Sequence, residues 1–274
     1  MRWLALLAVA LLVVTGAGLA LGAQVGSDGQ VASFGAKLNP SALPRDRLVP
    51  VKIGVEGEFL ATPENNLAQL RSLEIAVNRH GKLNTNGLPS CRIHQLIATS
   101  GEDALAKCGD ALLGKGLIRS ATEFPEQGRA HVKAPILVFN GRWHDGRGRV
   151  FLHIHGTIPN PFTVVVPIDV RRTNGTFGTI FFAEMPGFAR RWAYLTKFRF
   201  VMGGSYWDEG KRKSALLASC PAPKGLNGAV FPFARATYRF MTTKTLRTTL
   251  VGGCKVRREQ STEKSRDKHP YGRN

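Results

Sequence analysis

The stretch RVFLHIH at residues 149–155, followed by FTVVVPIDV at residues 162–170, decides the fold class. In the first segment Val150, Leu152 and Ile154 alternate with other residues, so they share one face of an extended chain. The second segment is rich in β-branched residues, which favour strands. Two short strands separated by a Gly- and Pro-containing connection indicate a β-sheet.

The same pattern recurs along most of the chain, in further segments of alternating or continuous apolar character: residues 49–60, 72–78, 135–139, 178–183, 195–202, 236–241 and 245–251. Asn140-Gly141 reads as a turn after one of them, and Asp145-Gly146 as a hairpin tip. We therefore predict an all-β fold, a disulfide-stapled β-sandwich or a partly closed barrel, with roughly 9–12 strands and one short helix.

The helix is expected after Thr99-Ser100. Acidic residues follow in its first turn, apolar residues recur at three- and four-residue spacing, and Gly114 is expected to end it. This helix would hold Cys108 near Cys91. A weaker helical pattern spans Pro186–Ala193.

Four cysteines follow the N-terminal segment, and an even number in an exported chain indicates two disulfides. Three pairings are possible. We favour the sequence neighbours, Cys91 with Cys108 and Cys220 with Cys254, because shorter loops close at lower entropic cost. No CxxC pair occurs, which argues against a zinc or redox site.

Residues 1–23 have the layout of a secretory signal peptide: an arginine at position 2, an apolar run and small residues near Ala20 and Gly22. The run is also long enough to remain as a membrane anchor over residues 3–23. Residues 24–47 are interpreted as a flexible linker, residues 48–254 as a single β-rich domain, and residues 255–274 as a disordered basic tail. The protein is therefore expected to be extracytoplasmic, either secreted or tethered.

The formal net charge is +19. The tail contributes seven Lys/Arg against three Asp/Glu, so most of the positive charge lies in the folded body. Outside the cytoplasm such a surface meets anionic cell-wall polymers or a membrane surface. Colloidal stability without a dedicated partner is the alternative. No specific nucleic-acid partner is predicted.

His153 and His155 form the sharpest local motif, because alternate residues of a strand share a face and two imidazoles can provide half of a metal site. No acidic residue follows them closely, and His131 and His144 could complete a set only if the fold allows it. Two polar residues on a strand face are the alternative. Metal ligation stays a candidate role, and no cofactor is predicted.

Other catalytic patterns are weak. The sequence has no Gly-x-Ser-x-Gly elbow, HExxH or phosphate-binding glycine loop. The basic and aromatic segment Lys197–Phe200 could stack on nucleic acid. We favour an amphipathic strand with Phe198 and Phe200 inward, because alternation alone explains the pattern. We assign no catalytic residue.

Two stretches of the chain carry a resemblance to a known family. The first comprises Gly81–Cys91 and Ala104–Gly114, and the second comprises Cys220–Gly225, Ala229–Ala236 and a final Cys254. Together they resemble a family of exported proteins from high-GC actinobacteria. The resemblance covers most of Val49–Val256. It implies export, a β-rich fold and paired cysteines, and it carries over no catalytic or ligand-binding residue.

The function predicted from the sequence is that of a non-enzymatic protein of the cell surface or envelope, with anionic polymers as candidate ligands of its basic surface. The alternative is a carbohydrate-active or other hydrolase whose site is assembled from distant strands, with two convergent acids in a cleft.

Overall fold

The structure is a computed structural model and describes residues 21–257, apart from 65, 85–86, 124–125, 127, 145–146, 158–159 and 243–244. Most of the described chain belongs to one large sheet, whose neighbouring strands are antiparallel except for the last pair. In spatial order its strands are β1 (Leu21–Ser27), β2 (Gln30–Asn39), β5 (Lys52–Ala61), β13 (Ala193–Met202), β8 (Leu112–Thr122), β9 (Ala130–His144), β10 (Arg147–Gly156), β11 (Phe162–Arg172), β12 (Phe177–Glu184), β6 (Leu70–Asn78), β17 (Gly228–Phe240), β18 (Thr245–Val256) and β3 (Ala42–Leu43).

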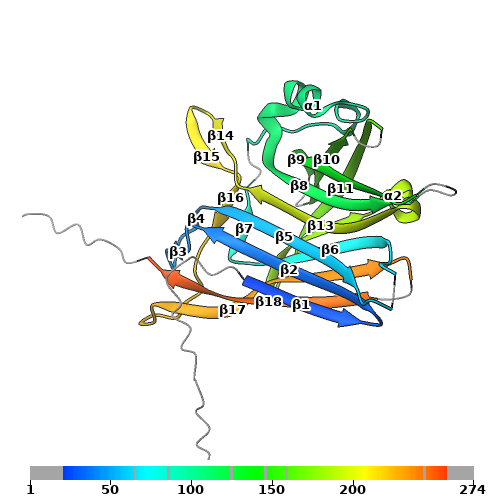
Figure 1. Ribbon diagram of the computed structural model, residues 1–274. Helices are drawn as coiled ribbons and strands as arrows, with labels where there is room; N and C mark the ends of the chain where they lie inside the picture. The colour runs from blue at the N-terminus through cyan, green and yellow to red at the C-terminus, as the bar shows by residue number, and fades with distance from the viewer. Residues whose placement is uncertain are drawn as a thin grey trace, which may run out of the picture.

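The sheet curls back on itself. β1 lies beside β18 in Figure 1 and contacts it, although no ladder joins the two within the described residues. Twist accumulates from strand to strand, and a sheet this wide curls rather than staying flat. The curl gives every long strand an inner and an outer face.

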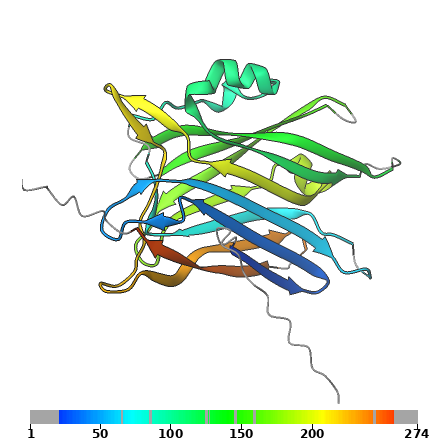
Figure 2. The same cartoon turned by 60° about the vertical axis from the view of Figure 1, so that its left-hand side comes forward.

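Two cores form, one on each side of the sheet. The inner core gathers alternate apolar residues from all around the curl, with Phe59, Phe198 and Tyr238 in ring contact at one side. The outer core lies over β9 and β10, where Leu137, Phe139 and Phe151 pack beneath α1 (Gly101–Cys108) and two 3-10 turns (Ile93–Gln95 and Gly109–Ala111). Figure 2 shows α1 on the outside of the curled sheet.

The remaining elements lie at the ends of the curl and above it. A three-stranded sheet of β4 (Val49–Pro50), β16 (Leu216–Ala218) and β7 (Gly81–Leu83) lies at one end, and α2 (Gly187–Trp192) lies at the opposite end in Figure 1. The hairpin of β14 (Ser205–Asp208) and β15 (Lys211–Ser214) projects beside the three-stranded sheet.

Two disulfides join these parts in the pairing expected for sequence neighbours. Cys91–Cys108, with Cα atoms 5.5 Å apart, ties the end of α1 to a segment whose Cys91 amide donates to the Asn140 carbonyl of β9 at 2.8 Å. Cys220–Cys254, with Cα atoms 5.6 Å apart, ties the segment after β16 to β18. The first bridge therefore fastens α1 to the large sheet. The second fastens the three-stranded sheet, through the segment after β16, to β18.

The all-β, disulfide-stapled fold class predicted from the sequence is confirmed. Both expected helices are present, and each expected strand segment overlaps a strand, although residues 49–60 divide between β4 and β5 and β17 ends at Phe240. The strand count exceeds the prediction, because β1–β3, β7, β8 and β14–β16 carried too weak a pattern to be recognised.

The prediction of a flexible linker over residues 24–47 is wrong. This segment contributes most of β1, all of β2 and β3, and the β-rich domain therefore starts before residue 48. Ala32, Phe34 and Ala36 are buried in the inner core. The sequence held a signal for this hairpin in Asp28-Gly29, since both residues have positive φ, as the two-residue turns that join antiparallel strands require.

Two local predictions are also wrong. Asn140-Gly141 is no turn, because β9 runs through it to His144, and the hairpin closes where His144 pairs with Arg147. The helix ends at Cys108 rather than at Gly114, which lies within β8. A Cβ at Gly114 would meet the Val201 backbone of β13, so this glycine permits close strand approach.

The predicted leader and tail fall largely outside the described residues. Residues 1–20 and 258–274 lie there, whereas Leu21–Ala23 belong to β1 and Lys255–Val256 belong to β18. No helix in the described part of the chain has the length and apolar character needed to cross a membrane.

Candidate functional site

His153 and His155 lie on the outer face of β10, beneath the segment that leads into α1. His153 is 1% exposed, and its Nε2 lies 3.1 Å from both the hydroxyl and the carbonyl oxygen of Thr99. His155 Nδ1 lies 3.0 Å from Thr163 Oγ1, on β11. The two rings share a face, as the sequence predicted, but each faces a threonine.

The hydroxyl protons determine which ring nitrogens donate. Thr99 Oγ1 donates to the Leu96 carbonyl at 2.7 Å, and Thr163 Oγ1 donates to the Thr99 carbonyl at 2.8 Å. Each hydroxyl has only one proton, so each accepts from the facing imidazole. His153 is therefore protonated on Nε2 and His155 on Nδ1, an assignment from the hydrogen-bond network. The pair fastens the start of α1 to β10 and β11.

This arrangement does not support metal ligation. A metal ion would bind the unprotonated ring nitrogens, and that of His153, Nδ1, is buried without a hydrogen-bond partner. Desolvation lowers the pKa of His153. His131 and His144 lie near opposite ends of β9, and no group of three metal-ligating side chains occurs among the residues that the structure describes.

The basic and aromatic segment Lys197–Phe200 lies in β13 and alternates between the two faces of the sheet. Phe198 is buried, Phe200 lines the interior and Arg199 is exposed. Lys197 pairs with Glu58 of β5 at 3.2 Å. Alternation along a strand therefore accounts for the interleaved charges and rings.

The most prominent concave feature is the interior of the curled sheet, which holds two cavities. The first, here the β16 cavity, has a volume of about 290 Å³ and is lined at one end by residues of β7 and β16. Its wall consists mainly of apolar side chains on β2, β5, β6, β10, β12, β13 and β17, such as Leu38, Val55, Val77, Phe181 and Phe231. Its size is close to the lower end of the range for ligand cavities.

The second, here the α2 cavity, has a volume of about 300 Å³ and lies at the opposite end of the curl. Apolar side chains of β8–β11, β6 and β13 form its wall, among them Ile118, Val164 and Leu195. Phe188 and Ala189 of α2 complete it, and Phe188 is 43% exposed, so the cavity reaches the surface beside this helix.

The two cavities adjoin. Four side chains near the middle of the curl belong to both walls: Ile75, Leu152, Ile168 and Phe200. The two apolar cavities therefore lie end to end between α2 and the three-stranded sheet, with these four side chains between them. An apolar cavity does not hold water well, and it favours an apolar ligand.

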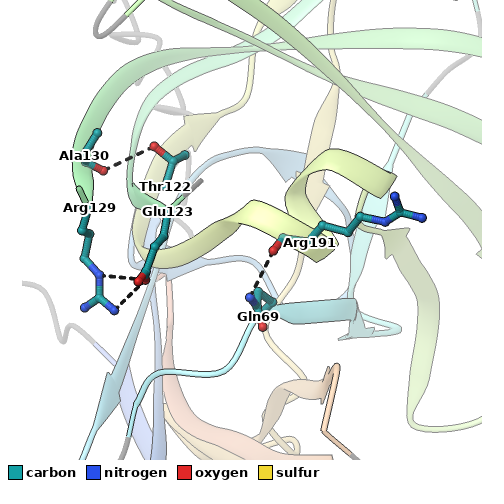
Figure 3. Close-up of polar contacts among 6 residues, drawn as sticks. All are labelled: Gln69, Thr122, Glu123, Arg129, Ala130 and Arg191. Atoms are coloured by element: carbon teal, nitrogen blue, oxygen red, sulfur yellow. Dashed lines mark hydrogen bonds and ion pairs between the residues drawn. The ribbon is translucent and has the colours of Figure 1, made fainter. Parts of the chain in front are cut away.

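Polar contacts tie α2 and its surroundings to neighbouring elements (Figure 3). Gln69 Nε2 donates to the Arg191 carbonyl of α2 at 3.4 Å, and the Glu123 amide donates to the Trp192 carbonyl at 2.9 Å. The Glu123 carboxylate pairs with Arg129 at 2.9 Å. The helix that ends the α2 cavity is thus held in place from two sides.

The two cavities differ in charge. No ionisable residue is found among the described residues that line the α2 cavity. His80, Lys82 and Lys255 line the β16 cavity, and neither wall, within the described residues, includes Asp or Glu. Within the described residues, neither lining contains the two convergent acids of a glycosidase-type site.

Sequence analysis did not identify this interior as a site. Its residues read as core positions of separate strands, and nothing in a period-two pattern distinguishes a filled interior from a hollow one. Comparison with protein-family models, with curated proteins and with solved structures gives no match.

Proposed function

We propose that this protein is an exported, non-enzymatic binding protein that encloses the apolar chain of a ligand inside its curled sheet. The observation that carries this proposal is the pair of adjoining apolar cavities, each close to 300 Å³. Burial of an apolar chain contributes about 25 cal/mol of favourable transfer free energy per Å² of apolar surface buried.

Two features support an extracytoplasmic setting. The disulfides indicate an oxidising compartment. The basic excess would favour contact with an anionic membrane surface, where an apolar ligand could be exchanged. The protein would be either secreted or tethered to the membrane by residues 3–23.

The test is a titration with N-phenyl-1-naphthylamine, a neutral fluorophore that brightens in apolar surroundings. We expect saturable binding by the purified protein. Leu152→Trp places an indole where both cavities meet and should weaken binding by about ten-fold or more. Val201→Trp is the matched control, because Val201 is 54% exposed on β13 and lines neither cavity.

Circular dichroism and urea unfolding would establish that both variants fold. Absence of saturable binding, or equal binding by the folded Leu152→Trp variant, would contradict the proposal.

Binding of anionic cell-wall polymer by the outer surface is a second candidate, favoured by the net charge of +19. It predicts retention on wall polymer that weakens steeply with salt. This retention should be unchanged in Leu152→Trp, which separates it from ligand binding inside the sheet.

A further inference from the structure

The positive groups of the β16 cavity gather at its solvent-facing rim. Lys82 lies on β7 and Lys255 on β18, and both are exposed. His80 precedes β7 and is half-buried, with Nδ1 3.3 Å from Ser219 Oγ. Three cationic or titratable residues from two segments of the chain, residues 80–82 and β18, therefore line the same end of the interior.

The rim also provides neutral hydrogen-bonding groups. Ser219, Thr179 and Ser41 line the same cavity. Asn78 is already used, since its Oδ1 accepts from the His80 amide at 3.0 Å and its Nδ2 donates to the Pro232 carbonyl at 2.7 Å. No carboxylate within the described lining neutralises the lysines.

The α2 cavity, at the opposite end of the interior, has no ionisable residue in its described lining. Among the described residues that line the α2 cavity, the polar ones are Ser120, Thr122 and Asn160. A charged group placed there would lose its hydration without gaining a partner. A ligand with one charged end and one apolar end consequently fits the interior in a single orientation.

We propose that the ligand is a single-chain amphiphile with an anionic headgroup, a carboxylate or a phosphate. The headgroup lies at the rim formed by His80, Lys82 and Lys255, and the chain extends past Leu152 and Phe200 toward α2. This inference rests on the proposed function and adds the class and orientation of the ligand.

Displacement of N-phenyl-1-naphthylamine tests it, using compounds of one chain length below their micelle concentrations: dodecanoate, dodecyl phosphate and dodecylammonium. The two anions should displace the fluorophore at concentrations about ten-fold lower than the cation. This preference should shrink in high salt, because the rim lysines are exposed. Inorganic phosphate, which has charge but no chain, should not displace it.

The double variant Lys82→Gln/Lys255→Gln should bind the neutral fluorophore as the natural protein does, with the preference for anions reduced to about two-fold or less. The matched control is Lys115→Gln/Lys133→Gln, which removes the same charge from exposed positions on β8 and β9 outside both cavities. The control should keep the preference.

Equal displacement by the cation, an unchanged preference in the rim variant or displacement by inorganic phosphate would each overturn the inference. In these cases fluorophore binding that still depends on Leu152 would leave the proposed function intact. Failure of the fluorophore to bind would overturn the proposed function itself.

Discussion

Acidification should destabilise this protein through His153, and replacing that residue should remove part of the effect. His153 is buried in the outer core, with the Phe139 ring 6.4 Å away in an edge arrangement. Its Nε2 proton is donated to Thr99, so a second proton would have to enter at Nδ1, which has no partner. Desolvation lowers the pKa, the Thr99 carbonyl partly opposes this, and nearby His155 lowers it further.

The expected magnitude follows from proton linkage. Because folding lowers the pKa of His153, the unfolded chain binds the proton more readily below pH 6.5, and stability falls as the pH falls through that window. A single histidine contributes a slope of at most about 1.4 kcal/mol per pH unit, the limit for a group that stays neutral in the fold. His80, whose pKa is lowered by desolvation and by Arg79, adds to the slope of the natural protein in the same direction.

The assay is urea unfolding at intervals from pH 7.5 to pH 5 under non-reducing conditions. His153→Gln keeps an amide donor for Thr99 and removes the titrating group. Its free energy of unfolding should be lower than that of the natural protein at pH 7.5, and it should decline less on acidification. His131→Gln changes an exposed histidine on β9 and controls for loss of a histidine as such. Parallel curves for the natural protein and His153→Gln would refute the reasoning.

Three further predictions concern stability and are measured by urea unfolding at neutral pH. Replacing both Cys220 and Cys254 by Ala should lower the free energy of unfolding by about 3–4 kcal/mol, because the bridge closes a 34-residue separation. A loss below about 1 kcal/mol would show that the three-stranded sheet is held in place without the bridge. Tyr238→Phe should raise stability by about 1 kcal/mol, since the Tyr238 hydroxyl is buried without a partner, and a decrease would mean that the hydroxyl is satisfied. Gly116→Ala should cost about 1–3 kcal/mol, because its Cβ would meet the backbone of β13; Gly101→Ala, where nothing lies within 4 Å, is the control, and equal effects at both positions would contradict the steric argument.

Local patterns predicted the strong strands and the helices well. In β13 the apolar residues Phe198 and Phe200 alternate with Lys197 and Arg199, so burial of one face determines both the strand and its orientation. The same pattern did not predict β1 and β2. Its inward residues include Ala32 and Ala36, whose small side chains give little contrast with the Gly and Ser between them. Only pairing of β2 with β5 makes these positions a core.

The sequence by itself determined the fold class and the shared face of His153 and His155, because both depend on short separations along the chain, where spacing translates directly into geometry. It favoured the disulfide pairing of sequence neighbours without excluding the two alternatives, and the structure has that pairing. The tertiary structure decided what those histidines do, because their threonine partners come from outside β10. It also decided the candidate site. The interior forms only when the sheet curls, and Lys82 and Lys255, distant in sequence, reach one rim because β7 and β18 meet at the same end of the curl.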